Sequence, residues 1–232
     1  MEISFILVEP AVPENVGAAA RALKTMGFTD LRLVKPCDHL SLKSLMLGHG
    51  SHDILNNAKV FNTLEETLAD IDFSFATTSK QRWVKQNVIP IGELSGFINQ
   101  KIESVNRLAI VFGREESGLS NEEISLCDRA TTIPLKNSFP SLNLSQAVMV
   151  FAFMLSNSPE LHNHTSTEGV KNNGFKALKS RATEVLNRIG LTKNSLVHGR
   201  VLERLTEISD EDVNLLHSVT TKIIEKLDEM DK

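Results

Sequence analysis

The sequence predicts an α/β domain with a mainly parallel sheet, followed by a small all-helical extension. From Met1 to about Ser156, short apolar runs with strand character alternate with segments of helical spacing. Such alternation is typical of a parallel sheet that is covered by helices on both faces. After a polar stretch from Asn157 to Asn173, apolar residues recur only at helical spacing. The 232 residues are enough for one domain of ordinary size plus such an extension.

The predicted strands begin with Ile3–Val8, a short apolar run that ends just before Pro10. Leu108–Phe112 is apolar throughout and is followed by Gly113, as expected for a buried central strand. The remaining predicted strands are Leu31–Val34, Lys59–Phe61, Phe73–Ala76 and Ala130–Ile133.

Helical segments separate these strands. The alanine-rich segment Glu14–Met26 is closed by Gly27, a typical end of a helix. Thr63 and Glu66 have the spacing of a capping box at the start of the helix Thr63–Ala69. The other helices predicted in this part are Leu40–Leu47, Asn121–Leu126 and Asn143–Leu155.

The extension is predicted to be helical throughout. Its first helix shows apolar residues at helical spacing from Phe175 to Ile189, and the pattern repeats over Leu196–Leu205 and Val213–Leu227. We therefore expect a first domain over residues 1–157, a linker over 158–172 and a helical extension over 173–232.

Composition excludes several classes of protein. Apolar residues make up 41% and charged residues 23%, as in a soluble globular protein. A net charge of −4 argues against a polybasic chain that binds nucleic acid with its whole surface. Cys37 and Cys127 match no metal-ligand spacing, and the apolar run at the N-terminus is too short for a membrane span. We expect a reduced cytoplasmic protein with no metal and no membrane partner.

Three unusual segments follow predicted strands, where open α/β sheets bind their ligands. In the first, Glu14–Arg21, Gly17 permits close backbone packing at the start of a helix and Arg21 lies one turn further on. Taken alone, this pattern fits equally well an alanine-rich core helix with an arginine on its surface.

The second segment, Val111–Leu119, is a strand that runs into a glycine, a charged run and Ser117-Gly118. Its exposed amides suit a polar ligand, although a simple surface turn has the same pattern. The spacing of its glycines matches neither a dinucleotide fingerprint nor a Walker A loop. In the third segment, Ile133–Leu144, two prolines stop regular structure, and Ser141 or Asn143 can cap the next helix. An ordinary strand-to-helix connection explains that pattern too.

Taken together, the three segments resemble the three motifs of the SpoU/TrmH family, in the SPOUT superfamily of RNA methyltransferases. ENVGAAARALKTMGF resembles the first motif, IVFGREESGLSNEE the second and IPLKNSFPSLNLSQAV the third, in the same order and at the same spacing. The likeness covers most of Met1–Leu155 and is closest to the TrmJ/LasT branch. It implies a SPOUT-type parallel sheet with a C-terminal trefoil knot, a rare exception to the rule against threaded chains. It also implies S-adenosyl-L-methionine as cofactor and a homodimer.

The resemblance also assigns site residues by position. Cofactor contacts, many of them from the backbone, are expected at Thr77, Thr78, Ser79, Gly113, Ile133, Ser141, Leu142 and Asn143. The catalytic set is expected to be Arg21, Asn15, Glu115 and Asn143. In the family, the arginine that Arg21 matches helps to activate a ribose hydroxyl.

The chemistry explains why an arginine suits that place. A ribose hydroxyl is a weak nucleophile that must lose its proton as it attacks the methyl group in line. A cation beside the oxygen stabilises the developing negative charge, whereas an arginine is too basic to accept the proton itself. We therefore assign Arg21 an electrostatic and positioning role and leave the general base open.

Charge is segregated within the extension. Residues Gly169–Arg204 hold eight basic and two acidic residues, a net of +6, whereas Leu205–Lys232 has a net of −5. The basic part predicts phosphate contacts, and the same charges also fit a solvated helical face. The candidate RNA contacts in this part are Lys176, Lys179 and Arg181.

A second candidate RNA-binding segment contains Lys80, Arg82 and Trp83, the only tryptophan. An aromatic ring among cations can stack on a splayed base, but the ring can equally pack on its own domain. Arg21 completes the predicted RNA-binding set.

The sequence thus predicts 2′-O-methylation of a ribose in RNA, with tRNA favoured over rRNA. Two alternatives stay open: a catalytically silent RNA-binding protein with the knotted fold, and a knotted enzyme that methylates a base. The intact polar motif residues argue against the first, and the SpoU-type motif set argues against the second.

Overall fold

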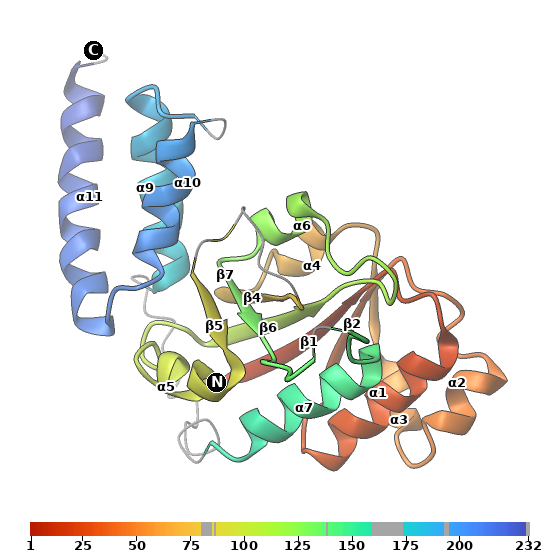
Figure 1. Ribbon diagram of the computed structural model, residues 1–232. Coiled ribbons are helices and arrows are strands. Elements are labelled where there is room, and N and C mark those ends of the chain that lie inside the picture. The colour runs from red at the N-terminus through yellow and green to blue at the C-terminus, as the bar shows by residue number, and fades with distance from the viewer. Residues whose placement is uncertain (80–84, 86, 138, 159–173, 193–194, 231–232) are drawn as a thin grey trace.

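A seven-stranded parallel sheet forms the centre of the first domain in the computed structural model, which describes residues 1–79, 85, 87–137, 139–158, 174–192 and 195–230 (Figure 1). The strand order is β3-β2-β1-β6-β4-β7-β5, and every neighbouring pair is parallel. The strands are β1 Glu2–Val8, β2 Asp30–Val34, β3 Lys59–Phe61, β4 Phe73–Thr77, β5 Val88–Pro90, β6 Arg107–Phe112 and β7 Arg129–Thr132.

Helices cover both faces of the sheet. Those of the first domain are α1 Pro13–Thr25, α2 Leu42–Leu47, α3 His52–Asn57, α4 Leu64–Leu68, α5 Ile91–Asn99, α6 Asn121–Leu126 and α7 Leu144–Ser156. On one face, Phe5 and Leu7 of β1 belong to a core shared with α1 and α7. On the other face, Ile6 and Val8 belong to a core shared with α4 and α6. Because β1 is buried on both faces, its sequence is continuously apolar instead of alternating.

The extension consists of α9 Phe175–Arg188, α10 Leu196–Leu205 and α11 Asp210–Met230, beside β5 and α5 in Figure 1. It shares a core with the first domain, because Phe175 is fully buried with its ring 5.1 Å from that of Phe73. The Phe175 amide donates to the Ser104 carbonyl at 3.1 Å. Lys101 Nζ donates to the Ile208 carbonyl at 2.7 Å. The extension is therefore docked on the first domain.

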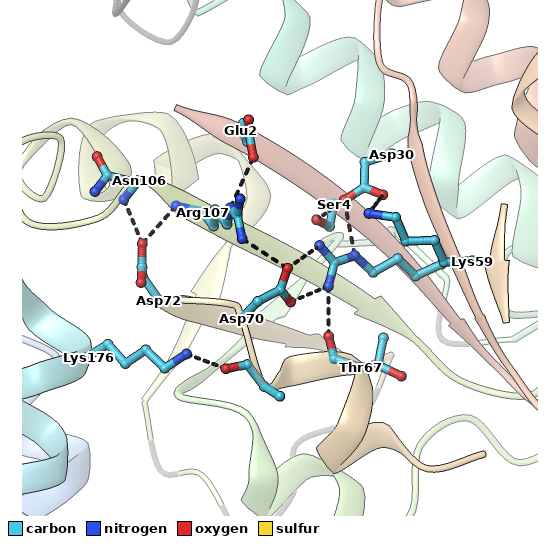
Figure 2. A network of polar contacts seen from close by, with 12 residues as sticks. Glu2, Ser4, Asp30, Lys59, Thr67, Asp70, Asp72, Asn106, Arg107 and Lys176 are labelled. Carbon is cyan, nitrogen blue, oxygen red and sulfur yellow. Dashed lines mark hydrogen bonds and ion pairs between the residues drawn. The ribbon is translucent and has the colours of Figure 1, made fainter. Parts of the chain in front are cut away.

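The amino ends of the strands carry a polar network (Figure 2). Arg32 of β2 is only 3% exposed, and its guanidinium donates to Asp30 at 3.0 Å and to the Thr67 carbonyl at 2.9 Å. It also donates to Asp70 at 3.0 Å through Nη2. Such pairing offsets the cost of burying the charge, and the loss of one partner would leave an unpaired buried charge at this edge of the sheet.

The predicted α/β class with a parallel sheet and appended helices is confirmed. Each predicted strand and helix is present within a few residues of its expected bounds; the strand expected at Ala130–Ile133, for example, is Arg129–Thr132. Elements β5, α5 and α3 had not been predicted. β5 has three residues and ends in a proline, while α5 contains two glycines, which weaken the sequence signals of a strand and a helix.

The predicted linker lies almost wholly outside the described residues. Within the described part of the chain, no helix is long and apolar enough to cross a membrane.

Candidate active site

A pocket of about 300 Å³ lies at the carboxyl ends of β4, β6 and β7. Its walls are the loops that follow these strands and the start of α7. The predicted cofactor positions that line it are Thr77, Thr78, Ser79, Gly113, Ile133, Ser141 and Leu142. The structure therefore brings together, in one cavity, residues from three distant parts of the sequence.

The eighth predicted cofactor position, Asn143, caps α7 beside this pocket. Its Oδ1 accepts from the Ser145 amide at 2.9 Å, and its own amide donates to Gln146 at 3.1 Å, which completes a capping box. Of the two caps that the sequence allowed, Ser141 and Asn143, the structure uses Asn143, which fixes where the third motif turns into the helix.

Close backbone packing explains Gly113, and a left-handed backbone explains Gly118. Arg114 and Gly118 exchange backbone hydrogen bonds of 3.3 and 2.9 Å, which closes a tight turn. A Cβ atom on Gly113 would lie 2.1 Å from the Gly118 carbonyl carbon, a distance that real Cβ atoms do not reach. Gly118 itself has a φ of +69°, in the left-handed region that favours glycine.

Three of the predicted catalytic residues form one hydrogen-bonded network. Glu115 accepts from the side-chain amide of Asn15 at 2.9 Å, and from the backbone amides of Ala11 and Val12 at 3.0 and 3.2 Å. The Asn143 side chain donates to Asn15 Oδ1 at 2.9 Å. The start of α1, the loop after β6 and the start of α7 are thus joined at one point, which we call the Asn15 network.

Glu115 is held as a carboxylate. Burial raises its pKa, but the hydrogen bonds from Asn15 and the two backbone amides outweigh burial, so the pKa lies below its ordinary value. Both carboxylate oxygens accept hydrogen bonds from the start of α1. Glu115 is therefore suited to ordering that segment, and it is a poor candidate for the general base.

Arg21 stands apart from the Asn15 network. It lies six residues further along α1 than Asn15, about 9 Å along the helix axis. Its side chain is exposed, and its guanidinium has no hydrogen bond or ion pair with the residues that the structure describes. It borders an open groove between α1 and α7 whose other side includes Gln146 and Met149.

The predicted RNA-binding lysines and arginine of the extension contact their own chain. Lys176 Nζ donates to the Ala69 carbonyl, and Arg181 donates to the Thr221 hydroxyl. Lys179 forms an ion pair with the buried carboxylate of Asp128. Contact with RNA through these cations stays a prediction, and the contacts within the chain already occupy part of their hydrogen-bonding capacity.

The other predicted RNA contacts, Lys80, Arg82 and Trp83, lie outside the described residues. Among the residues with described positions, no group of three or more His, Cys, Asp or Glu side chains is arranged to hold a metal ion.

Sequence reasoning missed the apolar wall of the pocket. Phe112, Leu119, Leu144 and Phe151 line it. Each belongs to a predicted strand, helix or motif, but the sequence does not distinguish an apolar residue that lines a pocket from one in the hydrophobic core. The places of Phe112, Leu119 and Leu144 next to a motif glycine or the cap were a signal that could have found them, whereas Phe151 gave no such signal.

Comparison with known families identifies the fold. The model of the SpoU rRNA Methylase family matches residues 2–153. The chain belongs to the SpoU methylase family. A second family model, for the C-terminal domain of the tRNA/rRNA methyltransferase LasT, matches residues 172–227, the region of the extension.

Relatives within the SpoU family cover the chain to different extents. A protein of Escherichia coli K12 named uncharacterized tRNA/rRNA methyltransferase LasT is 40% identical over 220 residues, which cover 94% of this chain and 95% of that protein. The tRNA (cytidine-2′-O-)-methyltransferase TrmJ of Methanocaldococcus jannaschii is 39% identical over 154 residues, or 65% of this chain and 66% of its own.

The crystal structure of TrmJ from Z. mobilis ZM4 superposes with a TM-score of 0.68 at 26% identity, covering 96% of this chain and 99% of that chain. The predicted position in the TrmJ/LasT branch of the SpoU family is confirmed.

Proposed function

We propose that this protein transfers a methyl group from S-adenosyl-L-methionine to a ribose 2′-hydroxyl of tRNA. The observation that carries the proposal is the meeting of the predicted cofactor positions in one pocket beside the Asn15 network. Two kinds of relative support it: TrmJ proteins are named as tRNA ribose methyltransferases, and LasT is named for tRNA or rRNA.

The pocket fits this cofactor in size and chemistry. Its volume lies at the lower end of the usual range for small-molecule sites. The apolar side chains of Leu119, Leu144 and Phe151 suit an adenine ring, while the loop 113–118 and the hydroxyls of Thr77–Ser79 suit the ribose and the amino acid end. When bound, the cofactor would supply an electrophilic methyl group.

The protein must then hold the acceptor ribose and stabilise its oxygen as the proton leaves. Arg21 suits this task, because its guanidinium is exposed beside the groove between α1 and α7. Glu115 acts indirectly, by holding the start of the helix that carries Arg21. The group that accepts the proton stays open.

The proposal includes a homodimer and the trefoil knot around the third motif. Beside Arg21, the face of α7 exposes apolar side chains that a second copy would cover: Met149 is 38% and Phe153 is 53% exposed. A second subunit over this groove would bring Arg21 into an enclosed site.

Calorimetric titration with S-adenosyl-L-methionine, with and without tRNA, tests the proposal. We expect the wild-type protein to bind the cofactor. Ala147 lines the pocket, so Ala147→Leu should abolish binding by filling it, whereas Ala177→Leu on α9 is the matched control and should bind normally. Failure of the wild-type protein to bind in either condition would instead support a catalytically silent RNA-binding protein.

A further inference from the structure

Arg114 is the centre of an ion network that shares no residue with the Asn15 network. Its Nε donates to Glu9 at 2.9 Å. Its Nη1 and Nη2 donate to the two carboxylate oxygens of Glu123, each at 3.0 Å, a bidentate pair. Nη1 also lies 3.4 Å from the Gly118 carbonyl, across the turn. One guanidinium thus joins the end of β1, the loop and the start of α6.

Glu9 occupies a strained backbone position to take part. Its φ is +47°, in the left-handed region where residues other than glycine are uncommon. Its amide donates to the Val34 carbonyl at 2.8 Å, so the conformation is fixed at the carboxyl end of β1. The hydrogen bond from Arg114 holds the pKa of the Glu9 carboxyl below its usual range. A glycine would fit this backbone with less strain but could not reach Arg114.

Glu123 has a second role beside its pair with Arg114. Its carboxylate accepts from the Ser120 amide at 2.7 Å, while its own amide donates to the Ser120 hydroxyl at 3.2 Å. This capping box fixes the first turn of α6. Arg114 is consequently attached to an ordered helix start, and its position is well defined.

Arg114 and Glu115 are neighbours that anchor the loop to different elements. Glu115 bonds to the start of α1 through Asn15 and two amides, whereas Arg114 bonds to the end of β1 and to α6. The loop 113–118 that carries both residues forms one wall of the pocket. The wall is therefore attached to β1, α1 and α6.

We propose that Arg114, with Glu9 and Glu123, is a positioning residue that sets the shape of the pocket by fixing the loop 113–118. The identity of the ligand rests on the proposed function, but the ordering of the loop does not. The substitution Arg114→Lys keeps the positive charge but loses the bidentate hydrogen bonds to Glu123. It therefore separates the contribution of the charge to loop order from that of the hydrogen-bond geometry.

The test compares Arg114→Lys with Arg107→Ala. Arg107 begins β6, the strand that leads into the loop 113–118, and thus lies at the end of β6 away from that loop. It forms ion pairs of 3.1 Å with Glu2 and Asp70, shown in Figure 2. Its loss removes two ion pairs, more exposed than those of Arg114, far from the pocket. Two quantities are measured: hydrogen–deuterium exchange of the amides of residues 113–118, and the Kd for S-adenosyl-L-methionine.

We expect Arg114→Lys to speed exchange of the loop amides and to raise the Kd by about tenfold, the change expected when about one tenth of the molecules keep the loop in its binding arrangement. Arg107→Ala should leave both unchanged. Unaltered exchange in Arg114→Lys overturns the proposal, and so does faster exchange with an unaltered Kd. If the wild-type protein binds no cofactor, the proposed function fails, and loop exchange alone decides whether Arg114 orders the wall.

Glu9→Gly provides an independent test. It relieves the backbone strain and removes the carboxylate that Arg114 contacts. We expect an unchanged or higher Tm together with faster loop exchange and weaker cofactor binding. A purely structural role predicts that loop exchange and affinity follow the Tm, and that result would contradict the proposal.

Discussion

Single side chains connect segments that are far apart in the chain. Asn15 uses its amide nitrogen for Glu115 and its amide oxygen for Asn143, so one residue links all three motifs. The resemblance predicted these three positions, and the structure places them together. It could not predict Arg114, because an arginine in a charged turn is most often a solvated surface residue.

At the residue scale, Glu115→Gln should lower the free energy of unfolding at neutral pH and make that free energy depend less on pH. The folded-state pKa of Glu115 is depressed, so its stabilising contribution is present above the unfolded value and is lost as the pH falls through the folded one. The variant leaves a backbone donor poorly matched, a cost of about 1–3 kcal/mol at neutral pH. Urea unfolding at pH 7 and pH 3.5 measures this. If wild type and variant lose the same stability between pH 7 and pH 3.5, the pKa of Glu115 is not depressed by folding.

Arg21→Ala should leave folding and cofactor binding intact and reduce methyl transfer by a factor of about 10²–10³. The reason is that the guanidinium has no hydrogen bond or ion pair with the described residues, so its loss breaks none of them. Single-turnover transfer to tRNA, with calorimetry and thermal melting as controls, measures the effect. Turnover at the wild-type rate would refute the role of Arg21.

At the scale of elements, close packing decides which helices touch. Gly17 lets α1 approach α2, since a Cβ there would lie 2.0 Å from the Ser44 carbonyl oxygen. The long apolar elements could be predicted, because their sequence patterns are strong. The elements β5 and α3 could not, because β5 ends in a proline and α3 has only two apolar residues among its six.

Gly17→Ala should therefore destabilise the fold by about 2 kcal/mol, the usual cost of overpacking. Gly96 of α5 is the matched control, since a Cβ there meets nothing within 4 Å. Gly96→Ala should stabilise the protein by about 0.5–1 kcal/mol through helix propensity. Denaturant unfolding measures both. Similar effects from the two substitutions would show that the contact between α1 and α2 is unimportant.

On the scale of the whole molecule, the docked extension changes how its charge is interpreted. The sequence showed a basic segment, but a count of charges does not reveal which face each side chain takes. The structure turns Lys176 and Lys179 towards the first domain. Lys101 lies in the same junction with its Nζ 5.0–5.7 Å from the ring centroids of Phe97, Phe175 and Phe73.

Burial lowers the pKa of Lys101 to about 8. Between pH 8 and the ordinary lysine value of 10.5, the unfolded chain binds more protons than the folded one, so this group makes stability rise with pH. Lys101→Met should remove that rise. Urea unfolding at pH 7.5 and 9.5 measures the change in the free energy of unfolding for wild type and variant, and the comparison of the two isolates Lys101. If the variant shows the same rise in stability as wild type, a group other than Lys101 causes it.

The central claim is ribose methylation, and the nucleosides of modified tRNA test it most directly. The protein is incubated with tRNA and S-adenosyl-L-methionine that carries a labelled methyl group, and the tRNA is digested to nucleosides. We predict that the label is found on 2′-O-methylated nucleosides. Label on a nucleobase, or no transfer to any RNA by protein that binds the cofactor, would contradict the claim.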